Sequence, residues 1–94
     1  MKVQEKIKHP SLPNHYIEFG IATWSEDDSN PEESIRRAVY NRDGVFSPHG
    51  SSEVPIEDIA LLTKECIKRD KLSVEEMTEL LSEIASSIKR QTEQ

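Results

Sequence analysis

The sequence has few of the features from which secreted and membrane-spanning proteins are built. It contains one cysteine, Cys66, so no internal disulfide can form, whereas small secreted domains usually depend on several. No stretch approaches the roughly 18–20 apolar residues that a membrane-spanning helix needs. The first ten residues, MKVQEKIKHP, also lack the apolar segment of a secretion signal. We therefore expect a cytoplasmic protein.

The motifs of metal and catalytic sites are absent as well. The three histidines, His9, His15 and His49, are scattered, and no CxxC, HxH or HExxH pattern occurs. Gly50-Ser51-Ser52 lacks the lysine and second glycine of a phosphate-binding loop. A domain with so few apolar residues seldom builds a pocket that shifts the pKa of a carboxylate. We predict no catalytic residues, no metal and no cofactor, and expect that the protein is not an enzyme.

Aromatic residues are scarce, and hydrophobic residues make up only 34% of the 94 positions. A chain of this length has room for one small core, so we expect a single domain over 1–94. None of the aromatic residues lies after position 46, which points to the N-terminal half as the place to look for function. The aromatic residues are Tyr16, Phe19, Trp24, Tyr40 and Phe46.

The charge balance is acidic, with 18 Asp and Glu against 12 Lys and Arg and a net charge of −6. Neutralising phosphates requires clustered positive charge, so this balance opposes broad contact with nucleic acid or with an anionic membrane. We expect neither as a partner. Acidic residues at the starts of the predicted helices and basic residues at their ends account for most of the charge pattern.

The segment from His15 to Trp24 alternates in a way that predicts a strand. Ile17, Phe19 and Ile21 fall on one face, and their neighbours fall on the other. Such a strand must pair with residues 1–8, with 44–48 or with another chain. Residues 1–14 are either a short strand or a flexible arm.

Three helices are predicted after this strand. Asn30-Pro31 followed by two glutamates is typical of a helix start, and that helix would end near Asn41. A second helix is expected from about Pro55 to about Asp70. A third begins with the capping box of Ser73 and Glu76 and continues to about residue 90, leaving 91–94 as a frayed tail.

These elements predict an α+β fold in which one or two short strands pack against three helices. The second and third helices are joined by few residues, so we expect them to form a C-terminal antiparallel helical hairpin that supplies most of the core. Cys66 lies on the apolar side of the second helix, where we expect it to pack in the core.

Basic and aromatic residues gather in positions 36–49, beside a loop rich in Gly, Pro and Ser. Arginine presents a planar fork for carboxylates or phosphates, and aromatic rings add stacking faces. Structural roles are an alternative to this interpretation. Arg36 and Arg37 each have a glutamate four residues earlier with which they can form an ion pair, and Phe46 can fill the core. The partner-binding candidates are Arg36, Arg37, Tyr40, Arg42, Phe46 and His49.

By elimination, the sequence favours a non-catalytic protein-binding or regulatory module whose partner is another protein. A second hypothesis is a homodimer through the 16–24 strand, with Tyr16, Phe19 and Trp24 at the interface. One alternative is a DNA-binding regulator that uses the helical hairpin, although the helix expected to read bases carries four glutamates before its first basic residue, Lys89. Another alternative is a small enzyme.

Overall fold

The computed structural model describes residues 1–93 of the chain. Their contacts group into two compact units, unit 1 (Met1–Ile59) and unit 2 (Ala60–Gln94). Unit 1 contains all the strands and unit 2 contains nearly all of the α-helical residues.

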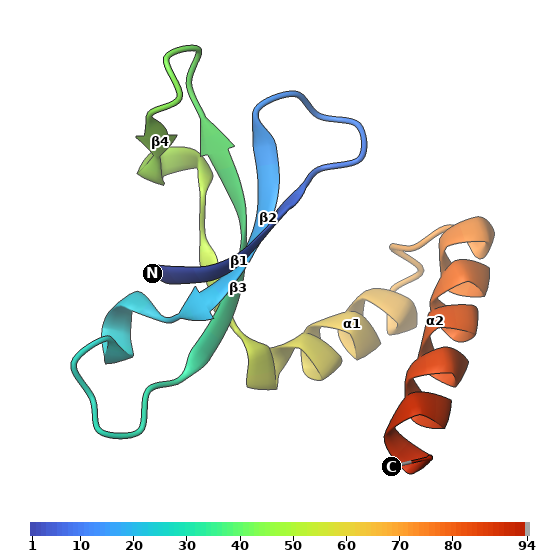
Figure 1. The fold of residues 1–94 in the computed structure, drawn as a ribbon. Helices are drawn as coiled ribbons and strands as arrows, with labels where there is room; N and C mark the ends of the chain where they lie inside the picture. Colours follow the sequence, from blue (N-terminus) through green and yellow to red (C-terminus); the bar gives the residue numbers. More distant parts are fainter. Residues whose placement is uncertain (94) are drawn as a thin grey trace. The chain divides into compact units, whose positions relative to one another are not determined.

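Unit 1 is a curled antiparallel sheet (Figure 1). Four strands follow one another in the order β1-β2-β3-β4, and β5 also pairs with β3. β5 pairs with the first half of β3, and β4 pairs with its last two residues. Short 3-10 turns connect several of the elements. The strands are β1 (Lys2–Lys8), β2 (His15–Ile21), β3 (Glu33–Tyr40), β4 (Phe46–Ser47) and β5 (Glu53–Pro55), and the turns are η1 (Thr23–Ser25), η2 (Pro48–Gly50) and η3 (Ile56–Asp58).

The fully buried part of unit 1 is small and mostly polar. Side chains of successive strand residues point to opposite faces, so β2 and β3 divide into an inner and an outer set. The inner set contains Glu18, Ser34 and Ala38, all with no exposed surface. The other buried residues of the sheet unit are Gly20 of β2 and, at η1, Ala22 and Ser25. The larger apolar side chains of β2 lie on the outer face and are only half-buried.

The N-terminal segment is a strand and not a flexible arm over Lys2–Lys8. It pairs antiparallel with β2, with a change of register between Val3 and Glu5. The two strands come very close at Gly20, because a Cβ atom there would lie 2.0 Å from the carbonyl oxygen of Lys2. This glycine allows the sheet to curl without displacing β1.

The helix predicted from Asn30 to Asn41 is wrong, since residues 33–40 form β3. The helix-start residues lie in the loop before the strand. Ile35, Val39 and Tyr40 favour extended backbone, and pairing with β2 satisfies the backbone hydrogen bonds that a helix would otherwise make. The ion pairs expected within that helix are replaced by a contact between strands, from Arg36 to Glu18.

The predicted α+β architecture of one or two strands on three helices is therefore wrong. In the described part of the chain, five strands form the sheet and two segments are α-helical. Part of the 44–48 segment forms β4, and Gly44 in the turn before it has a φ of +77°. η2 and β5 follow β4 in the chain.

Unit 2 consists of α1 (Ile59–Lys68) and α2 (Val74–Thr92), of which α1 begins at the last residue of unit 1. The capping box at the start of α2 is confirmed, because Ser73 accepts from the Glu76 amide and Glu76 accepts from the Ser73 amide. α2 reaches Thr92, so part of the tail expected to fray is helical, and residue 94 lies outside the described residues.

The two helices do not lie side by side as the predicted hairpin would, because α2 turns away from α1 at a wide angle (Figure 1). No described residue of unit 2 is buried, and Cys66 is exposed. The expectation that a hairpin supplies most of the core is wrong, since all the buried residues of the described chain lie in the sheet unit. No helix within residues 1–93 combines the length and apolar character needed to cross a membrane.

Candidate functional site

The centre of unit 1 is the carboxylate of Glu18, on the inner face of β2. Arg36 is its partner in the β2–β3 register and donates to Oε1 from Nε at 2.8 Å, with Nη2 2.7 Å from the same oxygen. The other oxygen, Oε2, accepts a 2.5 Å hydrogen bond from the Tyr40 hydroxyl. The ammonium group of Lys6, on β1, lies 3.9 Å from the same Oε2 atom. A buried carboxylate requires such compensation, because an unpaired charge away from water is very costly.

Aromatic rings hold these cations in place. The Lys6 ammonium lies 4.3 Å from the centre of the Tyr16 ring and 4.1 Å from that of Tyr40. The Arg36 guanidinium lies 4.1 Å from the centre of the Phe46 ring. The three rings meet edge to face, at 5.5 Å for Tyr16–Tyr40 and 5.7 Å for Tyr40–Phe46. We call Lys6, Tyr16, Glu18, Arg36, Tyr40 and Phe46 the Glu18 cluster.

The surroundings of Tyr40 change its acidity. Desolvation by burial, together with the hydrogen bond to Glu18 and the negative charge of that carboxylate, raises the pKa of Tyr40, and Lys6 opposes this in part. The phenol therefore stays protonated and keeps donating to Glu18 at neutral pH. Within the Glu18 cluster the buried carboxylate is fully paired, while the second cation, Lys6, is partly exposed to solvent.

A second polar group joins the start of η1 to β5. Glu53 accepts from the Thr23 backbone amide, from the Thr23 hydroxyl and from the Ser34 hydroxyl. Burial alone would raise the pKa of Glu53, but the hydrogen bonds from Thr23 and Ser34 and the N-terminal ammonium outweigh it and lower the pKa. These bonds tie β5 to the segment after β2.

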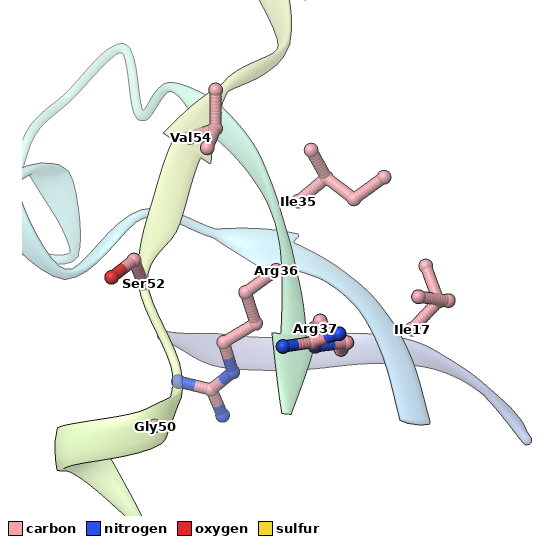
Figure 2. Close-up of a pocket in the computed structure, with 7 residues that line it drawn as sticks. All are labelled: Ile17, Ile35, Arg36, Arg37, Gly50, Ser52 and Val54. Atoms are coloured by element: carbon pink, nitrogen blue, oxygen red, sulfur yellow. The ribbon is translucent and has the colours of Figure 1, made fainter. Parts of the chain in front are cut away.

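The outer face of the sheet contains a pocket of about 400 Å³ beside Arg37. Arg37 lies opposite Ile17 in the β2–β3 ladder, and Ile35 lies opposite Val54 in the β3–β5 ladder. Figure 2 shows these side chains around the end of β3, with the loop before β5 beside them. We call this site the Arg37 pocket, and its lining residues are Ile17, Ile35, Arg36, Arg37, Gly50, Ser52 and Val54.

Arg36 and Arg37, adjacent in sequence, have different environments. The Arg36 side chain is only 10% exposed and its charge is matched by Glu18. Arg37 is exposed, and no carboxylate within residues 1–93 lies at ion-pair distance from it. A guanidinium next to apolar side chains can bind a carboxylate with two parallel hydrogen bonds while the isoleucines receive an apolar group.

The six partner-binding candidates do not form one surface. Arg36, Tyr40 and Phe46 belong to the Glu18 cluster. Arg37 lies on the outer face, at its pocket. Arg42 is exposed in the turn between β3 and β4, and His49 is exposed in η2.

The residues proposed for a strand interface are also separated. Tyr16 and Phe19 point to opposite faces of β2, and both edges of that strand pair within the chain, with β1 and β3. Trp24 follows in η1, where it is 48% exposed and its indole Nε1 donates to Glu32 at 2.8 Å. The open edges of the sheet belong to other strands.

Sequence reasoning missed Glu18 and Lys6 as cluster members. The available signal was the position of Glu18 between Tyr16 and Gly20 on one face of an alternating strand, where a carboxylate must be exposed or paired. Lys6 gave no comparable signal, because its role depends on the β1–β2 register.

The chain matches no protein-family model, no curated protein and no solved structure in the comparisons with known proteins. Within the described residues, no three His, Cys, Asp or Glu side chains converge as ligands for a metal ion.

Proposed function

We propose that the chain is a non-catalytic protein-binding module, acting in the cytoplasm, that uses the Arg37 pocket to bind a segment of another protein. The recognised segment has a carboxylate next to an apolar side chain. The observation that supports this proposal is the exposed guanidinium of Arg37, unpaired within residues 1–93, beside the apolar pocket of Ile17, Ile35 and Val54.

Rigidity around the pocket supports a binding role. β3 carries Arg37 on its outer face, while the same strand is fixed on its inner face by the Arg36–Glu18 pair. A side chain presented by a rigid strand loses less conformational freedom when a partner binds. Carboxylate recognition by arginine also depends on orientation, which a fixed backbone provides.

The experiment is selection from a random peptide display library on the full chain, followed by calorimetry with the peptides selected. We expect enrichment of peptides that combine Asp or Glu with an adjacent Leu, Ile or Phe. Arg37→Glu should weaken their binding by about tenfold or more. Arg42→Glu is the matched control, because it makes the same charge change on an exposed turn, and it should leave the affinity within about twofold.

The proposal fails if no acidic–apolar motif is enriched or if Arg37→Glu and Arg42→Glu have equal effects. Circular dichroism of both variants should match that of the wild type, since neither arginine is buried. A heparin column at low salt distinguishes the DNA-binding alternative, because a protein that binds phosphates is retained and released by salt. We expect no retention.

A further inference from the structure

α2 carries an apolar stripe that α1, the other helix of unit 2, leaves mostly exposed. Its exposed members include Leu81, Ile84 and Ile88, with 68%, 51% and 57% of their surface accessible. Exposure of this extent along one side of a helix is unusual for a monomeric protein in water. The stripe consists of Met77, Leu80, Leu81, Ile84, Ala85 and Ile88.

α1 is too short to cover this stripe. α1 has 10 residues and α2 has 19, so they extend about 15 Å and about 28 Å at the α-helical rise. The groove between them, of about 200 Å³, is lined by Thr63 and Ile67 of α1 and reaches only Ile84 on α2. Ala85 and Ile88 lie beyond the groove.

The stripe is symmetric from end to end. Measured from the midpoint between Ser82 and Glu83, Met77 lies as far towards the N-terminus as Ile88 lies towards the C-terminus. The same holds for Leu80 with Ala85 and for Leu81 with Ile84. Two antiparallel copies related by a twofold axis at this midpoint therefore place apolar residues against each other along the whole stripe.

One flank of the stripe carries charges that fit the same arrangement. Glu76, Glu83 and Arg90 recur every seven residues, so they lie along one side of the helix. In the antiparallel pair, Glu76 of one copy lies within one residue of the level of Arg90 of the other. The twofold axis repeats this attraction on the other side of the pair. Glu83 lies near the axis, where it meets its own copy.

We propose that two copies of this chain dimerise through α2, antiparallel about the midpoint between Ser82 and Glu83. Parallel helices would place the acidic starts of α2, Glu75 and Glu76, together. The antiparallel arrangement sets each acidic start beside a basic end and opposes the helix dipoles favourably. This inference is independent of the proposed function, because it uses unit 2 and not the Arg37 pocket.

The first test measures the mass of the full chain by sedimentation equilibrium over a range of concentrations. We expect twice the 10.8 kDa of the monomer for the wild type, and a monomer for Leu81→Glu. Ser86→Glu is the matched control, because it adds the same charge on the opposite side of α2, and it should remain a dimer. A monomeric wild type, or an intact Leu81→Glu dimer, overturns the proposal.

The second test concerns the direction of the helices. Glu76→Arg and Arg90→Glu should each weaken dimerisation by about tenfold, because each replaces two attractions by two repulsions. The double variant Glu76→Arg, Arg90→Glu should restore the wild-type affinity, and Glu83→Gln should strengthen it by removing the like charges at the axis. A double variant as weak as the single variants overturns the antiparallel arrangement. Circular dichroism should show an unchanged helix content for Arg90→Glu and Glu83→Gln, whose side chains are exposed. Glu76→Arg also removes the capping bond from the Ser73 amide, so the deciding comparison is the double variant against Glu76→Arg, both of which lack that bond.

Discussion

Arg36 lies directly opposite Glu18 in the β2–β3 ladder, and its guanidinium contacts a carboxylate that has no exposed surface. The sheet unit therefore has a charged centre, in a position where most small domains have aliphatic side chains. Because this pair joins two strands that are far apart in the sequence, its geometry also fixes which face of β3 is turned inwards.

Removal of the Arg36 guanidinium should strongly destabilise unit 1. Arg36→Met keeps the aliphatic part of the side chain but leaves the buried Glu18 carboxylate without its main partner, which should cost about 3–5 kcal/mol of unfolding free energy. Urea denaturation followed by the fluorescence of Trp24, the one tryptophan of the chain, measures unit 1 alone. Arg37→Met, at an exposed neighbour, should change stability by about 0.5 kcal/mol or less. Equal effects of the two variants would contradict this account.

The same pair predicts the outcome of a double substitution. Glu18→Leu combined with Arg36→Met removes both charges, so no uncompensated charge stays buried, and much of the stability lost in Arg36→Met should return. If the double variant is less stable than Arg36→Met, the pair must stabilise unit 1 by more than each charge offsets the cost of burying the other. The same urea denaturation measures this comparison.

Tyr40 should make the stability of unit 1 sensitive to alkaline pH. The pKa of Tyr40 is raised in the fold, so its contribution is complete below the unfolded value of about 10 and decreases as the pH rises through the folded value. The wild type should exceed Tyr40→Phe in stability at neutral pH, and this difference should shrink above about pH 10. Denaturation of both proteins at a series of pH values measures the difference, and a constant difference over that range would exclude the effect.

Glu53 should make the stability of the protein sensitive to acidic pH. Its pKa is lowered in the fold, so its contribution is present above the unfolded value of about 4.3 and is lost as the pH falls through the folded value. Glu53→Gln should destabilise the protein at neutral pH, by about 1–3 kcal/mol through the weakened bonds from Thr23 and Ser34. Thermal melts of the two proteins should converge below about pH 4. Melts that stay equally far apart would show that the carboxylate charge is unimportant.

Gly20 should tolerate no side chain. Gly20→Ala brings a Cβ atom within 2.0 Å of the Lys2 carbonyl oxygen, so β1 must shift, and we expect a loss of about 3 kcal/mol. Gly50→Ala is the control, since its Cβ would meet only a Val39 methyl group at 3.3 Å. Amide hydrogen exchange should show faster exchange in β1 for Gly20→Ala alone. Unchanged protection of β1 would contradict the close approach.

Local signals predicted several elements correctly. The alternation over 15–24 predicted β2 and its two faces, although the strand ends at Ile21 and residues 23–25 form η1. The capping box predicted the start of α2 at Ser73. Both depend on residues close together in the sequence. The partner-binding candidates were a weaker prediction, because Arg36 and Arg37 look alike in the sequence and only strand pairing with β2 sends them to different faces.

The failure at residues 33–40 has a physical cause. A helix pattern was inferred from Asn30-Pro31 and the glutamates that follow, and these local preferences are worth only about 1 kcal/mol each. Pairing of the whole segment between β2 and β4–β5 competes with them through long-range contacts, including the Glu18–Arg36 pair. Tertiary contacts of this kind override weak local preferences.

The sequence by itself determined the small size, the acidic balance, the strand β2 and the helix that starts at Ser73. These follow from composition and from interactions over a few residues. Only the tertiary structure decided that residues 33–40 are a strand, that Glu18 is the buried centre and that Arg37 has no carboxylate partner among residues 1–93. Each of those features depends on which strands pair and in which register, and pairing joins residues too distant in the sequence for local patterns to specify.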